Sequence, residues 1–372
     1  MTGTVVRAIG LMSGTSLDGI DAAVIETDGE RVIGFGPTFY RPYREPERVV
    51  LRQALAEAVT LKDRHARPGV IGEAEELTTR THAEVVERLM AEKDLKPADI
   101  TVVGFHGQTV IHRPAERLTI QVGDGLKLAK RLRIPVVHDF RQADIEAGGQ
   151  GAPLVPVFHR AIVGTIDRPH PVAVLNIGGV ANVTFVDGGP DPIACDTGPG
   201  NALIDDFMRA RTGAPYDDNG DAAATGTPDE KFIAGVLDHP FFDRKPPKSL
   251  DRNAFAFANI GLPEYSVADG AATLSLLTVE AVVRVLPHLP SRPRAWIVGG
   301  GGARNKTLMR MLAAKLKPAT VETADEAGFC ADALEAQAFA FLAVRSVRGL
   351  PITFPTTSGA PKPMLGGVVA KP

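Results

Sequence analysis

Short apolar segments that end in glycine-rich turns recur along this chain of 372 residues, and they limit its fold more than any other feature. Three of them read VVRAIGLMSGTSLDG (5–19), AVLNIGGVANV (173–183) and AWIVGGGGARN (295–305). Each apolar run has the length of a buried strand, and glycine lets the backbone turn sharply where the strand ends. Helical patterns at about 46–61 and 72–95 separate such strands. The alternation predicts an α/β protein.

The order of the segments predicts two domains. Strands are expected at 5–11, 21–27 and 31–40, and a single buried strand at 100–110 ends in a polar turn. A chain of 372 residues is too long for one ordinary core. We expect residues 1–139 plus 352–372 to form the first domain and residues 140–351 to form the second.

Composition excludes several classes of function. The chain carries 41 basic and 44 acidic residues, so its net charge of −3 gives no electrostatic reason to bind nucleic acid or an anionic membrane. Only two cysteines occur, which favours a reducing, cytoplasmic compartment over a disulfide framework. We see no signal peptide and no apolar run near the roughly 18 residues that span a bilayer. A small-molecule protein is expected, with a homodimer as the commonest assembly in general.

The first glycine turn is similar to a phosphate-binding loop that lacks its lysine. Glycine allows successive N–H groups to point inward, and the hydroxyls of Ser13, Thr15 and Ser16 add donors. Asp18 or Asp21 could hold Mg²⁺ directly or through water. The alternative is a plain Gly-Asp hairpin turn between two strands.

Two further glycine turns strengthen the nucleotide hypothesis. ACDTGPGNALIDDF places Asp196 at a strand end, before a rigid Gly-Pro-Gly turn and a helix from about 202. VGGGGARN (298–305) removes side chains where a helix begins, so the sugar or phosphate of a nucleotide can approach closely. Three such clusters in two halves predict a nucleotide gripped between two domains. The alternative role for Asp196 is to cap the following turn or helix.

Six segments together resemble the anhydro-N-acetylmuramic acid kinase family of bacterial cell-wall recycling. They are IGLMSGTSLDGID, GFHGQTV, HDFRQADIEAGGQGAPLVP, LNIGGVANVT, CDTGPGNALID and VGGGGARN, in this order from Ile9 to about Gly366. The resemblance implies two actin-like (ribonuclease H-like) domains, each a mixed sheet flanked by helices, with the active site in the cleft between them. It also implies ATP and Mg²⁺, and conversion of 1,6-anhydro-N-acetylmuramic acid into N-acetylmuramic acid 6-phosphate.

The resemblance assigns roles to residues of this chain. The general base is Asp196, which would activate the water that attacks C1 of the sugar, and the ATP loop corresponds to Gly14–Asp21. Of the two aspartates that could hold Mg²⁺, we choose Asp18, directly or through water. The residues expected to bind ATP are Ser13, Gly14, Thr15, Ser16, Leu17, Asp18, Gly19, Ile20, Asp21, Gly198, Gly200, Gly300 and Gly301.

Polar residues elsewhere would then bind the sugar. His106, Gln108 and Thr109 follow a predicted strand and could hydrogen-bond its hydroxyls, although a buried structural role suits His106 equally. Arg141 and Asp144 could bind the lactyl carboxylate and a hydroxyl, because a guanidinium matches a carboxylate with a planar fork. Alternatively, Arg141 and Asp144 form an ion pair that locks their loop.

A proline-rich segment at 238–255 departs from the family pattern. It reads Lys248-Ser249-Leu250-Asp251-Arg252-Asn253 where many members have Lys-Ser-Thr-Gly-Arg-Glu. We expect a loop or lid in which Lys248 or Arg252 could close over the phosphates, and the role of this lid stays open.

Two other functions compete with the family reading. An ordinary sugar kinase of the same fold would use Asp196 to deprotonate a hydroxyl of a free amino sugar. A nucleotide-switched protein would hydrolyse ATP slowly without any sugar, and the polar residues from 105 to 109 and from 141 to 144 speak against it.

Overall fold

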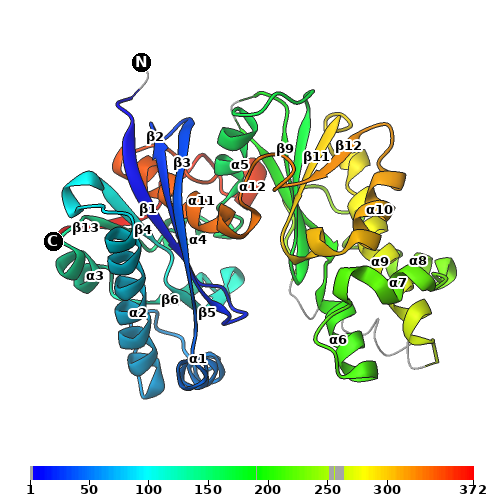
Figure 1. The fold of residues 1–372 in the computed structure, drawn as a ribbon, viewed down its shortest axis with the longest axis horizontal. Helices are drawn as coiled ribbons and strands as arrows, with labels where there is room; N and C mark the ends of the chain where they lie inside the picture. The colour runs from blue at the N-terminus through cyan, green and yellow to red at the C-terminus, as the bar shows by residue number, and fades with distance from the viewer. Residues whose placement is uncertain (1–2, 190, 251–254, 256–263) are drawn as a thin grey trace. The chain divides into compact units, whose positions relative to one another are not determined.

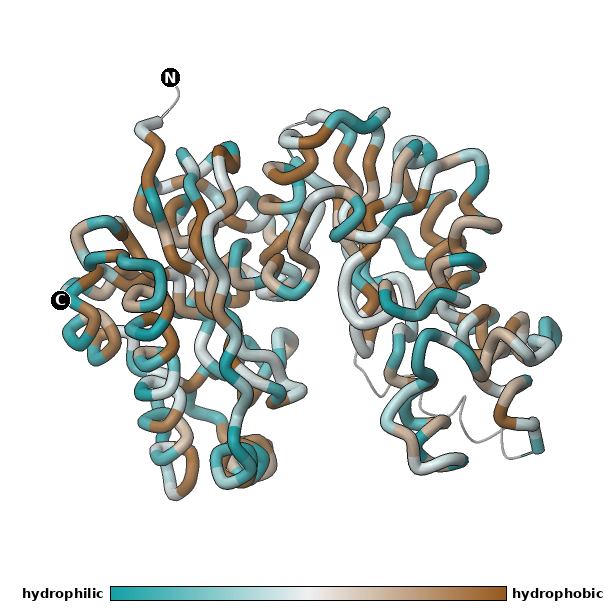
Figure 2. Tube along the Cα trace, viewed as in Figure 1, coloured by the Kyte–Doolittle hydropathy of each residue, from teal (hydrophilic) through white to brown (hydrophobic). Residues whose placement is uncertain are grey.

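The computed structural model describes residues 3–189, 191–250, 255 and 264–372, which fold into two compact units (Figure 1). The first unit comprises Met1–Thr165 and Asp332–Pro372, and the second comprises Ile166–Ala331. Apolar residues concentrate on the central strands of each unit (Figure 2). Each unit therefore has its own core.

The first unit is built on a six-stranded mixed sheet in the order β13-β7-β4-β1-β2-β3. Its strands are β1 (Val6–Met12), β2 (Gly19–Thr27), β3 (Val32–Pro42), β4 (Val102–Phe105), β7 (Val136–His138) and β13 (Val368–Ala370). The strands β1, β2 and β3 pair antiparallel, whereas β4 and β7 continue the sheet parallel to β1. A separate hairpin is formed by β5 (Gln108–Arg113) and β6 (Leu118–Val122).

The second unit repeats this scheme in a five-stranded sheet with the order β10-β9-β8-β11-β12. Its strands are β8 (Val172–Ile177), β9 (Val180–Val186), β10 (Ile193–Pro199), β11 (Ala295–Gly299) and β12 (Thr320–Thr323). Again three antiparallel strands come first, and two strands parallel to the first of them follow. The α/β class with mixed sheets is confirmed, and the repeat is what an actin-like pair of domains requires.

Helices flank both sheets. Those of the first unit are α1 (Glu45–Ala58), α2 (Val70–Glu92), α3 (Gly125–Leu132), α4 (Gln142–Glu146), α5 (Pro156–Val163), α11 (Leu334–Val347) and α12 (Pro355–Ser358). Those of the second unit are α6 (Ala202–Thr212), α7 (Asp221–Thr225), α8 (Glu230–Leu237), α9 (Val267–Val283) and α10 (Lys306–Lys315). Short 3₁₀ turns lie at η1 (Pro97–Asp99), η2 (Pro114–Glu116), η3 (Asp218–Gly220), η5 (Leu286–His288), η6 (Gly301–Arg304) and η7 (Ala331–Ala333).

Helix α11 packs directly on β1, β2 and β4, so the division of the chain differs from the predicted one. Residues 140–165 and 332–351 belong to the first unit, although the sequence placed them in the second. Side chains are absent where the backbones meet. A Cβ on Gly10 would lie 1.8 Å from the carbonyl oxygen of Ala336, and one on Gly104 would lie 2.0 Å from that of Phe339.

Helix α9 forms the centre of the second core. Twelve of its residues are buried, from Gly270 to Val282. Together with the turn that follows, it gives a 22-residue helix, Val267–His288, with a mean hydropathy of 1.4, which is long and apolar enough to cross a membrane. The sequence-based expectation of no such segment is therefore wrong by this measure. However, 72% of its apolar window is buried inside the protein, as expected of a core helix.

The expected single strand at 100–110 is interrupted. Strand β4 ends at Phe105, and Gln108 opens β5 in a different sheet. Gly107 makes the break possible because its φ is +74°, and a Cβ there would lie 2.8 Å from the carbonyl oxygen of Val122. Gln108 and Thr109 therefore lie on a strand of the hairpin, whereas the sequence placed them at the end of the single strand.

The close approach of α11 predicts a large effect of Gly104→Ala. The added methyl group would meet a backbone oxygen that cannot move aside, and overpacking of this kind costs about 1–3 kcal/mol. We expect urea denaturation to show a loss of about 2 kcal/mol. The matched control is Gly235→Ala in α8, where a Cβ meets nothing within 4 Å and the free energy of unfolding should rise by about 0.5–1 kcal/mol. Equal stability of Gly104→Ala and the wild type would contradict the packing described here.

Candidate functional site

The loop between β1 and β2 has the geometry of an anion-binding turn. The carbonyl of Gly14 accepts the N–H of Leu17 at 3.2 Å, and Leu17 adopts a positive φ of 59° to close the turn. Thr15 and Ser16 are exposed at its tip. Among the described residues, we find no acceptor for the N–H groups of Gly14, Thr15 and Ser16. These donors are available to a phosphate.

Several residues expected to bind the nucleotide instead anchor this loop. Ser13 is 1% exposed and its hydroxyl donates to the carbonyl of Gly107 at 3.4 Å. Leu17 and Ile20 belong to the hydrophobic core. A Cβ on Gly19 would lie 2.5 Å from the carbonyl oxygen of Arg41, so this glycine serves strand packing. The loop tip, Thr15 and Ser16, remains available for direct contact with a nucleotide.

Carboxylates gather beside the loop. Burial, with the added charges of Glu335, Asp332 and Asp18, raises the pKa of Asp21 to about 7. Among the described residues, no group of three or more His, Cys, Asp or Glu side chains is arranged to hold a metal ion by itself. The uncompensated negative charge nevertheless fits Mg²⁺, which usually keeps several waters and few protein ligands.

Three glycine turns meet in the second unit. The turn at Gly178 and Gly179 joins β8 to β9, and its two carbonyls accept the N–H groups of Asn201 (2.7 Å) and Gly200 (3.0 Å). A Cβ on Gly300 would lie 2.5 Å from the side-chain oxygen of Asn176. The predicted Gly200 and Gly300 are thus brought together around a turn that sequence reasoning had not assigned to the site.

The other two predicted glycines of this unit have different surroundings. Gly198 lies against helix α9, because a Cβ there would be 2.7 Å from that of Ala281. Gly301 opens the turn η6, near the side-chain amide of Asn201. Gly198 therefore serves packing, while Gly301 stays beside the cluster.

Asp196 lies on β10, where the pairing with β9 shifts register between Asp196 and Gly198. Its Oδ2 accepts the N–H of Leu250 at 2.7 Å, and its own N–H donates to the carbonyl of Lys248 at 2.9 Å. Burial raises the pKa of Asp196 to about 6, although the Leu250 N–H and the Lys248 charge act in the opposite direction. Asp196 does not cap a helix, since the N-cap of α6 is Asn201. The carboxylate has the basicity of a general base at neutral pH.

The expected lid role of Lys248 is wrong. Its side chain is 5% exposed, and its Nζ donates to the carbonyls of Phe241 (3.0 Å) and Phe242 (3.3 Å). The ammonium also lies 4.4 Å from the centre of the Phe241 ring. Lys248 is therefore tied down inside the second unit. Asp251, Arg252 and Asn253, the last three residues of the departing motif, lie outside the described residues.

His106 and Arg141 bind each other. The Nδ1–H of His106 donates to the carbonyl of Gly107 at 2.8 Å, and its Nε2 accepts from Arg141 at 2.9 Å. Burial and the Arg141 charge hold the pKa of His106 well below its usual range, so the ring is neutral. Arg141 also donates to the carbonyl of Gly151 at 2.8 Å. These contacts support the structural role of His106. All three guanidinium nitrogens of Arg141 already donate to protein atoms, which leaves few N–H groups for a carboxylate.

Asp144 locks a loop, but not through Arg141. It is 1% exposed, and its Oδ1 accepts the N–H of Gly151 at 2.7 Å. Its Oδ2 accepts the hydroxyls of Thr353 (2.5 Å) and Ser358 (2.6 Å). No ion pair joins Asp144 to Arg141 in the described part of the chain. Both expectations for Asp144, a sugar contact and an ion pair, are thus replaced by these bonds.

The two remaining sugar candidates differ in exposure. Gln108 is fully buried and its Nε2 donates to the carbonyl of Gly14 at 3.1 Å, so it holds the loop and does not reach a sugar. Thr109 is partly exposed, and its hydroxyl accepts from Gln121 at 3.2 Å.

A cavity of about 170 Å³ opens beside His106, where β4 and β7 end. It is lined by Arg64, His65, Arg67, Phe105, His106, Gly107, Gln121, Gly123, His138 and Asp139. Ligands of α/β sheets bind at the carboxyl ends of parallel strands, so this cavity is a candidate sugar site in the first unit. Sequence reasoning missed Arg64, which lies in no motif, and gave no site role to His138, although His138 opens the segment HDFRQADIEAGGQGAPLVP.

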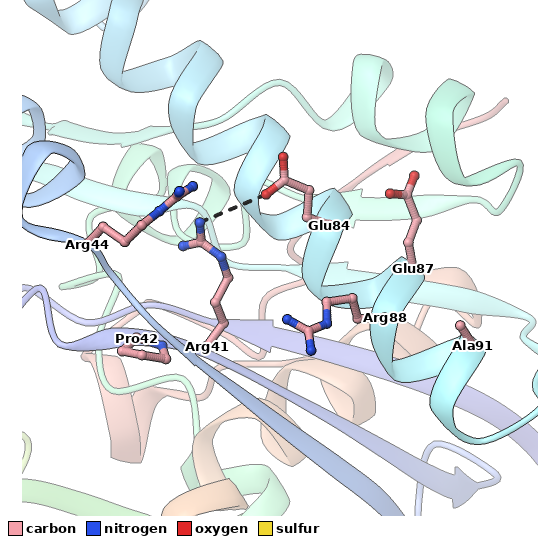
Figure 3. A pocket seen from close by; sticks show the side chains of 7 residues that line it. All are labelled: Arg41, Pro42, Arg44, Glu84, Glu87, Arg88 and Ala91. Atoms are coloured by element: carbon pink, nitrogen blue, oxygen red, sulfur yellow. Dashed lines mark ion pairs between the residues drawn. The ribbon is translucent and has the colours of Figure 1, made fainter.

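A larger hollow of about 670 Å³ does not coincide with the candidate site (Figure 3). Arg41, Pro42, Arg44, Glu84, Glu87, Arg88 and Ala91 line it. Figure 3 shows Arg41 directed toward Glu84, at 3.9 Å. Arg41 also pairs with Glu47 at 2.7 Å. Because its cations are largely neutralised by neighbouring carboxylates, we assign no ligand to this hollow.

The duplicated α/β fold, the donor-rich loop beside carboxylates and the basic aspartate are typical of kinases that transfer phosphate from a nucleotide. Residues 6–372 match the sequence model of the anhydro-N-acetylmuramic acid kinase family. The chain belongs to this family, and it is a kinase.

Similar proteins agree with this assignment. Proteins named anhydro-N-acetylmuramic acid kinase from Nitrobacter winogradskyi and Rhodopseudomonas palustris are each 58% identical to the chain over 365 residues, which cover 98% of it and 99% of theirs. The protein of the same name from Azorhizobium caulinodans is 59% identical over 369 residues, with the same coverage. These names do not favour an ordinary kinase of free amino sugars.

Solved structures show more distant likeness. Component A of (R)-2-hydroxyglutaryl-CoA dehydratase from Acidaminococcus fermentans is 12% identical, covers 92% of this chain and 99% of its own, and has a TM-score of 0.49. A ROK family glucokinase from Streptomyces griseus, in complex with glucose and AMPPNP, is 15% identical, covers 91% and 99%, and has a TM-score of 0.40. The assignment rests on the sequence family.

The raised pKa of Asp21 predicts that Asp21→Asn stabilises the fold while impairing the activity of the protein. Ionised Asp21 costs more in the folded than in the unfolded chain; the cost is absent below pH 4, grows up to about pH 7 and is constant above. We expect a gain of about 1 kcal/mol at pH 8 in urea denaturation, because partial exposure screens the charges. The gain should vanish near pH 4.

The control for this prediction is Asp191→Asn, which changes an exposed aspartate and should leave the stability unchanged. In the same preparation, Asp21→Asn should need more Mg²⁺ for half-maximal ATP turnover. Lower stability of Asp21→Asn at pH 8 would show that the carboxylates do not repel one another in the folded protein.

Proposed function

We propose that this chain opens 1,6-anhydro-N-acetylmuramic acid with water and phosphorylates O6, giving N-acetylmuramic acid 6-phosphate and ADP. The water oxygen bonds to C1, the bond from C1 to O6 breaks, and O6 takes the γ-phosphoryl group of ATP. The reaction would serve the recycling of cell-wall sugars. Family membership over residues 6–372 supports the substrate.

The observation that carries the mechanism is the raised pKa of Asp196, about 6, on a partly buried strand. We assign Asp196 as the base that takes the proton of the attacking water, on the face of C1 opposite O6, as in an inverting glycosidase. Such an enzyme normally needs a second carboxylic acid for the leaving oxygen. Here O6 is also the phosphoryl acceptor, so its developing charge passes into the new P–O bond. One carboxylate therefore suffices.

Backbone groups would hold the nucleotide, and each unit offers candidates. In the first unit, the N–H groups of Gly14, Thr15 and Ser16 suit phosphate oxygens. In the second, Gly200, Gly300 and Gly301 offer backbone without side chains near the Gly178 turn. Mg²⁺, when bound, neutralises charge on the phosphates, and Asp18 and Asp21 are the carboxylates that suit it, directly or through water.

The sugar would occupy the cavity beside His106. Its lining includes the guanidinium groups of Arg64 and Arg67, which pair with Asp139 at 2.7 Å and with Glu75 at 2.6 Å. One of these ion pairs would have to open for its arginine to bind the lactyl carboxylate. Thr109 remains a candidate hydrogen-bond partner from the neighbouring hairpin.

We further propose that the enzyme works in the cytoplasm, where ATP is present, without a nucleic-acid or membrane partner. The small net charge of −3 and the two cysteines, both of them free, support this proposal. A homodimer is the commonest assembly of soluble proteins and is our expectation for this chain.

Loss of the base should abolish most turnover. Asp196→Asn keeps the shape of the side chain but cannot take a proton, and general base catalysis is worth about 10²- to 10⁴-fold. We expect kcat to fall by about that factor in a coupled ADP assay, while ADP binding measured by calorimetry is unchanged. Asp187→Asn, an exposed change close in sequence, is the control and should retain full activity. Near-normal turnover of Asp196→Asn would remove Asp196 from the mechanism.

Product analysis in water enriched in ¹⁸O tests the reaction itself. With ATP, Mg²⁺ and the anhydro sugar, we expect one ¹⁸O atom at C1 of a 6-phosphorylated product, seen by mass spectrometry and by NMR. If the anhydro sugar gives no product but free N-acetylmuramic acid gives a 6-phosphate, the chain is an ordinary sugar kinase, and Asp196 deprotonates a hydroxyl instead of water.

A further inference from the structure

We propose that Gln108 is a positioning residue for the nucleotide loop and controls affinity for ATP, not for the sugar. The inference rests on the proposed function, because it takes the loop between β1 and β2 as a nucleotide site. The sequence suggests that Gln108 binds the sugar. The proposal places its effect on the nucleotide instead.

The geometry of one peptide unit carries the proposal. The side-chain Nε2 of Gln108 donates to the carbonyl of Gly14 at 3.1 Å, and the N–H of Leu17 donates to the same oxygen at 3.2 Å. The peptide bond between Gly14 and Thr15 is planar and trans, so its C=O and N–H point in opposite directions. Holding the carbonyl inward therefore aims the Thr15 N–H outward, toward the position of a phosphate.

The same turn holds the preceding residue of the loop. The carbonyl of Gly107 accepts the hydroxyl of Ser13 at 3.4 Å and the Nδ1–H of His106 at 2.8 Å. Two consecutive loop residues, Ser13 and Gly14, are thus fixed by two consecutive residues, Gly107 and the first residue of β5, Gln108. The nucleotide loop is positioned from outside its own sequence.

Burial excludes direct contact between Gln108 and a ligand. The residue is 0% exposed, so neither the sugar nor ATP can reach it. Among the described residues, its Oε1 has no hydrogen-bond partner. A buried unpaired acceptor costs stability, so removing the amide should not destabilise the fold. This separates a positioning role from a merely structural one.

The experiment compares Gln108→Met with Gln121→Met. Methionine matches glutamine in length but cannot donate to Gly14. Losing one such hydrogen bond should raise KM for ATP and Kd for ADP by about three- to tenfold. We expect KM for the anhydro sugar to stay within twofold, and the melting temperature to hold or rise. Gln121→Met, on the partner strand β6, removes bonds to Thr109 and Thr119 but none to the loop, and should leave ADP binding unchanged.

A second variant guards against a folding defect of the first. Gln108→Asn keeps the amide but withdraws it from Gly14 by one methylene, and it should also raise Kd for ADP. A higher KM for the sugar with unchanged ADP binding in either variant would make Gln108 a sugar-side residue. An equal loss of ADP binding in Gln121→Met would reduce its role to general support of the hairpin.

Failure of the proposed function is recognised separately. If the wild-type chain binds no ADP, the nucleotide assignment fails before any variant is compared. If the wild type binds ADP and both Gln108 variants bind it equally well, the inference alone is overturned.

Discussion

The backbone of α11 lies directly on β1 and β4, and the rest of the first unit depends on this contact. Gly10 and Gly104 permit it, since a Cβ on either would lie within 2.0 Å of a helix carbonyl. The contact brings a segment from the last tenth of the chain onto its first strand. Glu335 thereby comes within electrostatic reach of Asp21, and Phe339 lies 4.7 Å from the His106 ring. A packing constraint thus sets the charge beside the loop.

The carboxylates Asp21, Asp196 and Glu335 have a raised pKa, and we place the first two in the reaction. Asp21 in the first unit and Asp196 in the second have pKa values raised to about 7 and about 6, each mainly by burial. Paired carboxylates behave differently: two arginines lower the pKa of Glu47 to about 2. A half-buried carboxylate without a cationic partner is unfavourable for folding. Other interactions in the fold offset this unfavourable free energy. Such carboxylates are typical of sites that bind a cation or a proton.

The fold could be predicted from sequence further than the site could. Apolar runs ending in glycine marked β1, β8 and β11 because burial and turn formation are local requirements. The extent of each unit could not be predicted from local sequence, because α11 follows the second unit in the chain but packs on the first. The residues of the candidate site fall into the same two groups. Asp196 and the loop tip were found from motifs, whereas Asp332 and Arg64 lie outside any motif and enter through folding alone.

Polar residues in the motifs also proved to be poor candidates for direct contact with a ligand. His106, Gln108, Arg141 and Asp144 are polar residues beside strand ends, yet each spends its hydrogen bonds on protein atoms. Such bonds stabilise buried polar groups, because a buried donor or acceptor without a partner costs about 1–3 kcal/mol. The Oε1 of Gln108 is an exception, since it has no partner among the described residues. The partners of the four side chains are the backbone of Gly14, Gly107 and Gly151, which are glycine turns that have no side chains to fix them. In this fold, these polar side chains hold the glycine backbone in place and supply the rigidity that glycine lacks.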